Sequence, residues 1–241
     1  MELKHMRIVL DKIPALVCFA DTAVQAGERG TVLLYHGLGA HKESQTKELA
    51  TLAEQGFLAI CVDAVGHGER KLADFDIQFA RDNRDSEQNF VALLLDNVRE
   101  IPCLIDMLVA LGWTKPGKIG ITGISMGGYI SYASPLVDRR INVAAPILGS
   151  PQWKIFHAES PHLFPERFFP TALLAQNAGA DQFVPCHFAR DFHRKLKPYY
   201  LSAPERIHYI EFPEAGHFMV EAEWNALWHN VIAWFNKFLK G

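Results

Sequence analysis

The stretch "ITGISMGGYI", residues Ile121–Ile130, joins an apolar run to a helix-like continuation through a serine that lies between glycines. A Gly-x-Ser-x-Gly pattern between a strand and a helix is typical of a sharp turn that exposes the serine hydroxyl. Gly123 and Gly127 suit such a turn, because larger side chains would collide with the adjacent strand and helix. The stretch therefore makes Ser125 a candidate nucleophile, with an ordinary turn serine as the alternative.

Outward from this stretch, strand-like runs alternate with helix-like patterns along the whole chain. This alternation is the signature of an α/β fold with a mainly parallel sheet. Strands are predicted at residues 6–13 and 14–21, which could form a hairpin, and at 31–37, 57–63, 117–123, 141–150, 171–177 and 207–213. Helices are predicted at 44–56, 86–111, 125–134, 189–196 and 223–239, and Pro102 should kink or break the second of them.

Length and composition indicate one globular domain over residues 1–241. The apolar fraction of 49% and the charged fraction of 21% are ordinary for globular proteins. A formal net charge of −3 without basic runs argues against a nucleic-acid partner. No apolar run approaches the roughly 20 residues of a bilayer span, so no membrane association is expected. The four scattered cysteines and the lack of an export signal at the N-terminus favour a cytoplasmic protein.

One segment does not fit the alternating pattern. Residues 150–170, "SPQWKIFHAESPHLFPERFFP", hold four prolines and many aromatic side chains. The segment is interpreted either as a small lid after the sixth strand or as a loop that its aromatic residues anchor to the core. As a lid, it would place an apolar wall over a substrate pocket, formed by Trp153, Phe156, Leu163, Phe164 and Phe168, with Phe169 beside them.

A serine nucleophile needs a histidine base, and the histidine needs a carboxylate to orient it. "GADQFVP" places Asp181 in a loop after one predicted strand, and "EAGHFM" places His217 in a loop after the next. Loops that follow parallel strands gather at one edge of the sheet. We therefore expect Ser125, Asp181 and His217 to converge. Asp191, Glu205 and Glu211 compete for the acid role, and His187, His193 and His208 compete for the base role.

The tetrahedral intermediate of acyl transfer needs hydrogen-bond donors for its oxyanion. The backbone N–H of Met126, which follows the candidate nucleophile, is one predicted donor. The loop "YHGLGAH" should supply the other through the N–H of Leu38, since Gly37 and Gly39 free its main chain to turn. His36 is interpreted as a brace for this loop rather than as a base.

No pattern indicates a metal or a cofactor. Asp63 and His67 in "DAVGHGER" raise the question of a metal site, but a structural hydrogen-bonding role is the favoured interpretation. The chain has neither a His-Glu-x-x-His run nor a clustered cysteine–histidine pattern. "HGLGAHKES" lacks the glycine spacing of a phosphate loop or a dinucleotide fingerprint.

Taken together, "HGLG", "DAVGHGER", "GISMGG", "GADQFVP" and "AGHF" resemble the α/β-hydrolase superfamily over nearly the whole chain. The chain is most similar to small bacterial serine esterases related to dienelactone hydrolases and to the catalytic domains of prolyl oligopeptidases. It departs from dienelactone hydrolases, which use a cysteine nucleophile, and it lacks the N-terminal propeller of prolyl oligopeptidases, so peptidase activity is not implied. The resemblance implies a sheet of about eight strands flanked by helices and a triad of Ser125, Asp181 and His217.

The function expected from these features is hydrolysis of carboxylic esters with small or medium acyl groups, without a cofactor. A thioesterase or a carbon–carbon hydrolase could use the same triad, because fold and triad do not fix the substrate. A non-catalytic ligand receptor on the same fold is the alternative from a different class. The expected partner is a small-molecule ester, and the aromatic C-terminal helix leaves both a monomer and a weak homodimer open.

Overall fold

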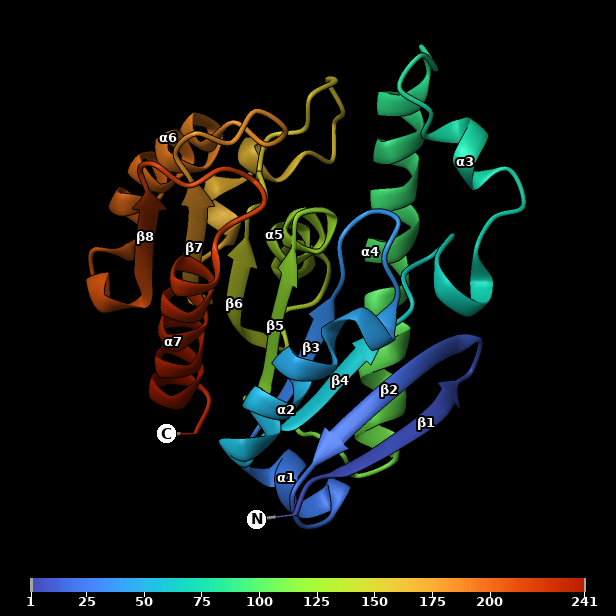
Figure 1. Ribbon diagram of the computed structural model, residues 1–241. Coiled ribbons are helices and arrows are strands. Elements are labelled where there is room, and N and C mark those ends of the chain that lie inside the picture. The colour runs from blue at the N-terminus through green and yellow to red at the C-terminus, as the bar shows by residue number, and fades with distance from the viewer. Residues whose placement is uncertain (1, 241) are drawn as a thin grey trace.

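The computed structural model describes residues 2–240, and its centre is a single sheet with the strand order β1-β2-β4-β3-β5-β6-β7-β8 (Figure 1). The β1–β2 hairpin is antiparallel and so is the β2–β4 pair, whereas all later pairs are parallel. This confirms the predicted eight-stranded, mostly parallel sheet. The strands are β1 (Lys4–Leu10), β2 (Ile13–Phe19), β3 (Thr31–Tyr35), β4 (Leu58–Val62), β5 (Ile119–Ile124), β6 (Ile141–Ile147), β7 (Ala172–Ala178) and β8 (Ile207–Phe212).

Helices connect the parallel strands and cover both faces of the sheet. The α-helices are α1 (Ala23–Arg29), α2 (Thr46–Glu54), α3 (Phe75–Gln78), α4 (Ser86–Ala110), α5 (Met126–Val137), α6 (Cys186–Leu196) and α7 (Glu221–Phe238). Short 3-10 helices lie at Lys42–Gln45, Gly68–Arg70, Pro161–Leu163, Pro165–Arg167, Lys197–Tyr200 and Pro204–Arg206. In Figure 1, α2 and α7 lie in front of the sheet.

The alternation of side chains along each strand divides the core in two. On β3, Val32 and Leu34 pack with apolar residues of α2 and α7, whereas Leu33 and Tyr35 pack with those of α1, α4, α5 and α6. All four of these strand side chains are buried. A strand covered on both faces needs the continuous apolar runs that the sequence shows.

Three helices differ from the sequence-based expectation. The short helix α3 was not predicted, and neither was helix α1. Its Gly27 packs so closely on the main chain of Trp113 that a Cβ atom there would overlap the Trp113 carbonyl. Pro102 was expected to kink or break the predicted helix 86–111, and a break is wrong, because α4 runs through the proline as one helix of 25 residues. Ile101, Leu104 and Ile105 are fully buried on either side of the proline, so packing holds both halves of the helix in place.

The carboxyl ends of β3, β5, β6, β7 and β8 point to the top of the molecule in Figure 1. The segment between β6 and β7 and the amino end of α4 lie at the same end. Among residues 2–240, no helix is long and apolar enough to span a bilayer.

Candidate active site

Ser125 stands in the sharp turn between β5 and α5, as predicted. Its backbone angles are φ 55° and ψ −111°, a conformation that a residue with a Cβ atom rarely adopts. The turn holds because the Ser125 N–H donates to the carbonyl of Ile147 on β6 at 2.9 Å, and the Ser125 carbonyl accepts from the N–H of Gly128 at 2.8 Å. Backbone strain that neighbouring strands enforce in this way is characteristic of functional sites.

The glycines around Ser125 are required because main-chain segments approach one another too closely there for a side chain to fit. A Cβ atom on Gly123 would come within 2.5 Å of the carbonyl oxygen of Gly127. A Cβ atom on Gly127 would overlap the carbonyl of Tyr35 on β3. Helix α5 therefore packs against the sheet at a distance that only glycine permits, and the Ser125 side chain is left only partly buried.

Asp181 and His217 meet in the loops after β7 and β8. The Nδ1–H of His217 donates to Oδ2 of Asp181 at 2.7 Å. The other carboxylate oxygen, Oδ1, accepts the backbone N–H groups of Phe183 at 2.8 Å and Val184 at 3.0 Å. The carboxylate is fully buried, and the imidazole has a side-chain exposure of 13%. Since Nδ1 is the donor to Asp181, Nε2 is left as the proton-accepting nitrogen of the neutral ring.

Asp181 is held in its ionised form. Burial alone would favour the neutral acid, but the hydrogen bonds from His217 and from the backbone of Val184 outweigh it and lower the pKa of the carboxyl. A buried carboxylate in this state stabilises a positive charge on the imidazole beside it.

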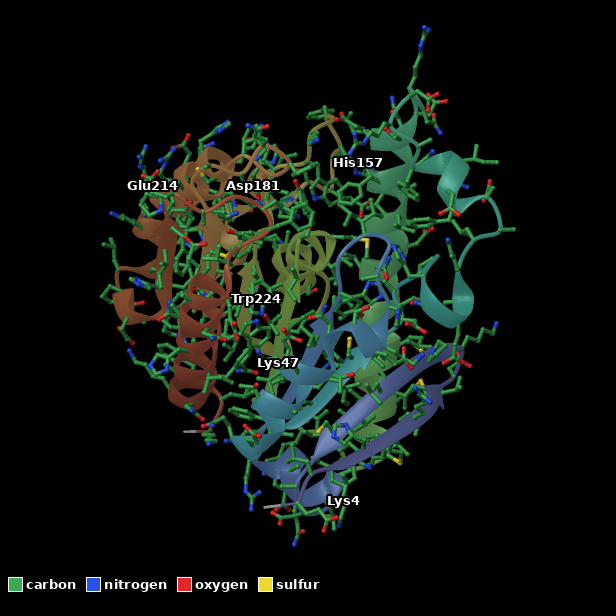
Figure 2. All side chains as sticks on the ribbon, in the orientation of Figure 1. Lys4, Lys47, His157, Asp181, Glu214 and Trp224 are labelled. Atoms are coloured by element: carbon green, nitrogen blue, oxygen red, sulfur yellow. The ribbon has the colours of Figure 1, made fainter. Side chains whose placement is uncertain are left out.

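A cavity of about 800 Å³ brings the candidate residues together, since Ser125, His217 and Leu38 all line it. Figure 2 places Asp181 near the carboxyl end of β7 and Trp224, which lines the cavity, near the start of α7. The main apolar walls come from α4 and the segment before it, from α5, and from the loop after β7; they include Phe79, Phe90, Val91, Tyr129 and Val184. Phe183 and Phe218 flank the His217 ring, with centroids 5.4 Å and 5.5 Å away.

The predicted wall from residues 150–170 is wrong, because within that segment only Lys154 lines the cavity. Trp153 and Phe168 are buried in the core, and the Phe168 ring packs on that of Phe192. Phe156 is 84% exposed, Leu163 is 41% exposed, and Phe164, like Phe169, packs against the edge of the core. The aromatic residues anchor the segment, which was the alternative interpretation. Residues 79–91 provide the wall instead. In the sequence, the one hint of this role was a pair of phenylalanines in an otherwise polar stretch.

His36 fixes the loop that carries Leu38. Its Nε2 accepts the backbone N–H of Ala64 at 3.1 Å, so the proton lies on Nδ1, which donates to the carbonyl of Gly37 at 2.8 Å. A peptide group is planar and trans, so fixing the Gly37 carbonyl also fixes the direction of the Leu38 N–H on its opposite side. The structure thus shows His36 in the bracing role that the sequence suggested.

We expect His36 to make stability depend on pH. Burial lowers its pKa from 6.5 to about 4. The unfolded chain therefore takes up a proton near pH 6.5 while the folded protein does not. The contribution of neutral His36 to the free energy of unfolding is thus intact above pH 6.5 and is lost as the pH falls toward 4. His36→Gln removes the titration. The stability advantage of the wild type over the variant should therefore shrink by roughly 3 kcal/mol across that range.

Urea unfolding of both proteins at pH 8, 6 and 4.5 measures this difference. Because the His67 ring centroid lies 5.1 Å from that of His36, both proteins are compared in a His67→Gln background, so that a change at His67 does not enter the difference. If the difference in unfolding free energy between wild type and His36→Gln stayed constant with pH, the assignment of His36 as neutral and doubly hydrogen-bonded would be wrong.

A second contact connects the loop that carries Leu38 to the loop after β4, and the sequence gave no sign that Lys42 would take part in it. Lys42 and Asp63 are both buried, with Nζ 2.8 Å from Oδ2, and Oδ1 accepts the Lys42 backbone N–H at 2.9 Å. Asp63 also accepts the N–H of Glu69 at 3.0 Å. The Nδ1–H of His67 donates to the carbonyl of Val65 at 2.9 Å. Asp63 and His67 thus make structural hydrogen bonds, and no metal-binding cluster of three or more His, Cys, Asp or Glu occurs within residues 2–240.

Comparison with known proteins gives the same assignment of family and fold. The family model described as serine aminopeptidase, S33, matches residues 26–199. A Bacillus subtilis protein named "Putative esterase YitV" is 25% identical over 237 residues, which cover 86% of this chain and 89% of that protein. TT1662 from Thermus thermophilus has a similar structure, with a TM-score of 0.83 at 18% identity and full coverage of both chains. An acylaminoacyl peptidase from Pyrococcus horikoshii gives a TM-score of 0.72 at 17% identity, covering 99% of this chain and 42% of that one.

Proposed function

We propose that this chain, which belongs to the serine aminopeptidase S33 family of α/β-hydrolases, hydrolyses carboxylic esters with small or medium acyl groups. The observation that carries the proposal is the shared cavity. Ser125, on its strained turn, and His217 both line this cavity. Nδ1 of His217 lies 2.7 Å from the buried carboxylate of Asp181, which leaves Nε2 for the serine. The match to an esterase name over most of the chain supports the same substrate class.

In the proposed mechanism, Oγ of Ser125 attacks the ester carbonyl while Nε2 of His217 takes its proton. Asp181 stabilises the imidazolium that forms. The N–H groups of Met126 and Leu38 stabilise the oxyanion, the first at the start of α5 and the second in the loop that His36 braces. The imidazolium then protonates the leaving alcohol, and a water activated by His217 releases the acid.

The cavity supports the choice of acyl group. It measures about 800 Å³, and its walls beside Ser125 are mostly apolar, with Ile124 and Leu148 adding to those of α4 and α5. Each methylene that an apolar wall removes from water contributes about 0.8 kcal/mol, or roughly a factor of 4 in binding. We therefore expect kcat/KM to rise with acyl length until the wall is covered, and then to level off or fall.

A panel of p-nitrophenyl esters from acetate to palmitate tests this expectation, with matched thioesters and aminoacyl p-nitroanilides as competing substrate classes. The proposal predicts a maximum at short or medium esters and at least ~10-fold lower kcat/KM for the anilides. A profile that is flat in chain length, or one led by thioesters or anilides, would contradict the proposed substrate class.

A further inference from the structure

Two phenylalanine rings beside His217 are not used by the proposed chemistry. Phe218 is 85% exposed and Phe183 is 56% exposed, and both line the cavity that Ser125 also lines. Apolar side chains that are exposed singly on a protein surface need no explanation, whereas exposed apolar side chains that adjoin one another at a cavity are typical of a ligand-binding site. The two rings therefore indicate a part of the substrate that covers them.

The two rings form one surface with the imidazole between the loops after β7 and β8. Their centroids lie 6.1 Å apart with an interplanar angle of 76°, and the His217 centroid is 5.4 Å from Phe183 and 5.5 Å from Phe218. Phe218 follows His217 directly in the chain, and the Phe183 N–H donates to Oδ1 of Asp181 at 2.8 Å. The main chain at both rings is thus tied to the residues that orient the proposed base.

The chemistry of acyl transfer decides which part of an ester lies beside these rings. When the C–O bond of the tetrahedral intermediate breaks, the departing oxygen takes the proton from Nε2 of His217. The alcohol part must therefore lie within hydrogen-bond distance of that nitrogen. The oxyanion is directed to the N–H groups of Leu38 and Met126, and the acyl group takes the remaining position on the carbon bound to Ser125. The rings that flank His217 are therefore next to the alcohol part.

We propose that Phe183 and Phe218 form the subsite for the leaving alcohol, and that this alcohol is aromatic, of the benzyl type. The inference rests on the proposed esterase function and narrows its substrate class. A benzyl group that covers the two rings removes their apolar surface and its own from water. It can also meet them edge to face, which favours an aromatic alcohol over an aliphatic one of the same size.

The experiment keeps the acyl group constant and varies the alcohol. Methyl, cyclohexylmethyl and benzyl butanoate form the same acyl-enzyme, so their kcat/KM values differ only through the steps up to departure of the alcohol. Acid release is measured in a pH-stat, and each kcat/KM is divided by the hydroxide-catalysed rate constant of that ester to remove differences in intrinsic reactivity. The wild type should favour benzyl over methyl by at least about 10-fold and benzyl over cyclohexylmethyl by about 3-fold.

Alanine variants assign this preference to the two rings. Phe218→Ala and Phe183→Ala should each lower the benzyl-to-methyl ratio by about 3-fold or more. Phe156→Ala is the matched control and should keep the wild-type ratio, because Phe156 is 84% exposed, like Phe218, but does not line the cavity. The methyl ester is the internal reference, since a disturbance of His217 would lower kcat/KM for all three esters together.

A wild-type benzyl-to-methyl ratio near 1 would overturn the inference without any variant. A ratio that persists in either alanine variant, or an equal loss on all three esters, would also overturn it, because the ring would then only support His217. A wild type that hydrolyses the cyclohexylmethyl ester as well as the benzyl ester would contradict the aromatic alcohol. Failure of the proposed function itself is a different result, because the wild type would then hydrolyse none of the three esters.

Discussion

Ser125→Ala is expected to lower ester turnover by about 10⁴-fold or more, because the proposed acyl-enzyme can no longer form. Stability should change by less than about 0.5 kcal/mol. The fold does not depend on the hydroxyl, since the side chain makes no capping hydrogen bond to α5, and alanine keeps the Cβ atom in the same strained turn. Turnover and the thermal midpoint measure the two effects. Ser134→Ala on the same helix is the control and should retain turnover.

Ser125→Gly separates the strain from the chemistry. Glycine adopts φ 55° without a Cβ penalty, so relief of strain worth about 1–3 kcal/mol should exceed the entropic cost of an added glycine. The variant should be as inactive as Ser125→Ala but melt roughly 2–4 °C higher. If both substitutions instead lowered the melting temperature by several degrees, Ser125 would be a structural turn residue and the nucleophile assignment would fail.

Asp181→Asn is expected to lower kcat by about 10⁴-fold through the tautomer of His217. The backbone N–H groups of Phe183 and Val184 hold the oxygen at Oδ1, so the new NH₂ group takes the place of Oδ2 and faces Nδ1 of the imidazole. Nδ1 then has to accept a hydrogen bond, the ring proton moves to Nε2, and the base can no longer take the serine proton.

Steady-state kinetics of Asp181→Asn measures the loss. Asp191→Asn serves as the matched control, because Asp191 is exposed on α6, pairs with Arg194 at 3.0 Å and competed for the acid role at the sequence level. Its kcat should stay within about 2-fold of the wild type, in line with the small worth of surface ion pairs. A loss below about 10-fold in Asp181→Asn would remove Asp181 from the triad.

The sequence predicted the sheet well, because strands buried on both faces are continuous apolar runs bounded by glycine or polar residues, as at 31–37 and 57–63. It failed where packing overrides local preference. Pro102 weakens α4 locally, but buried leucines and isoleucines on both sides of it hold the helix together. Helix α1 is short and contains a glycine, and the close contact with Trp113 that explains Gly27 is invisible in the sequence.

The sequence also predicted that Ser125, Asp181 and His217 lie at one edge of the sheet, because each follows a strand of a parallel sheet and such loops share one edge. The structure adds the 2.7 Å contact between His217 and Asp181 and the common cavity. The pocket wall could not be predicted, since aromatic density does not say which way a ring points. Phe168 points into the core and Phe156 into solvent.

The most direct test of the central claim is the site at which a fluorophosphonate attaches, measured by intact mass and peptide mapping in the wild type and in Ser125→Ala. Our account predicts one adduct per wild-type chain, on the peptide that contains Ser125, and none on folded Ser125→Ala. Labelling at another residue, equal labelling of both proteins, or no labelling of folded wild-type protein would contradict the assignment of Ser125 as the nucleophile.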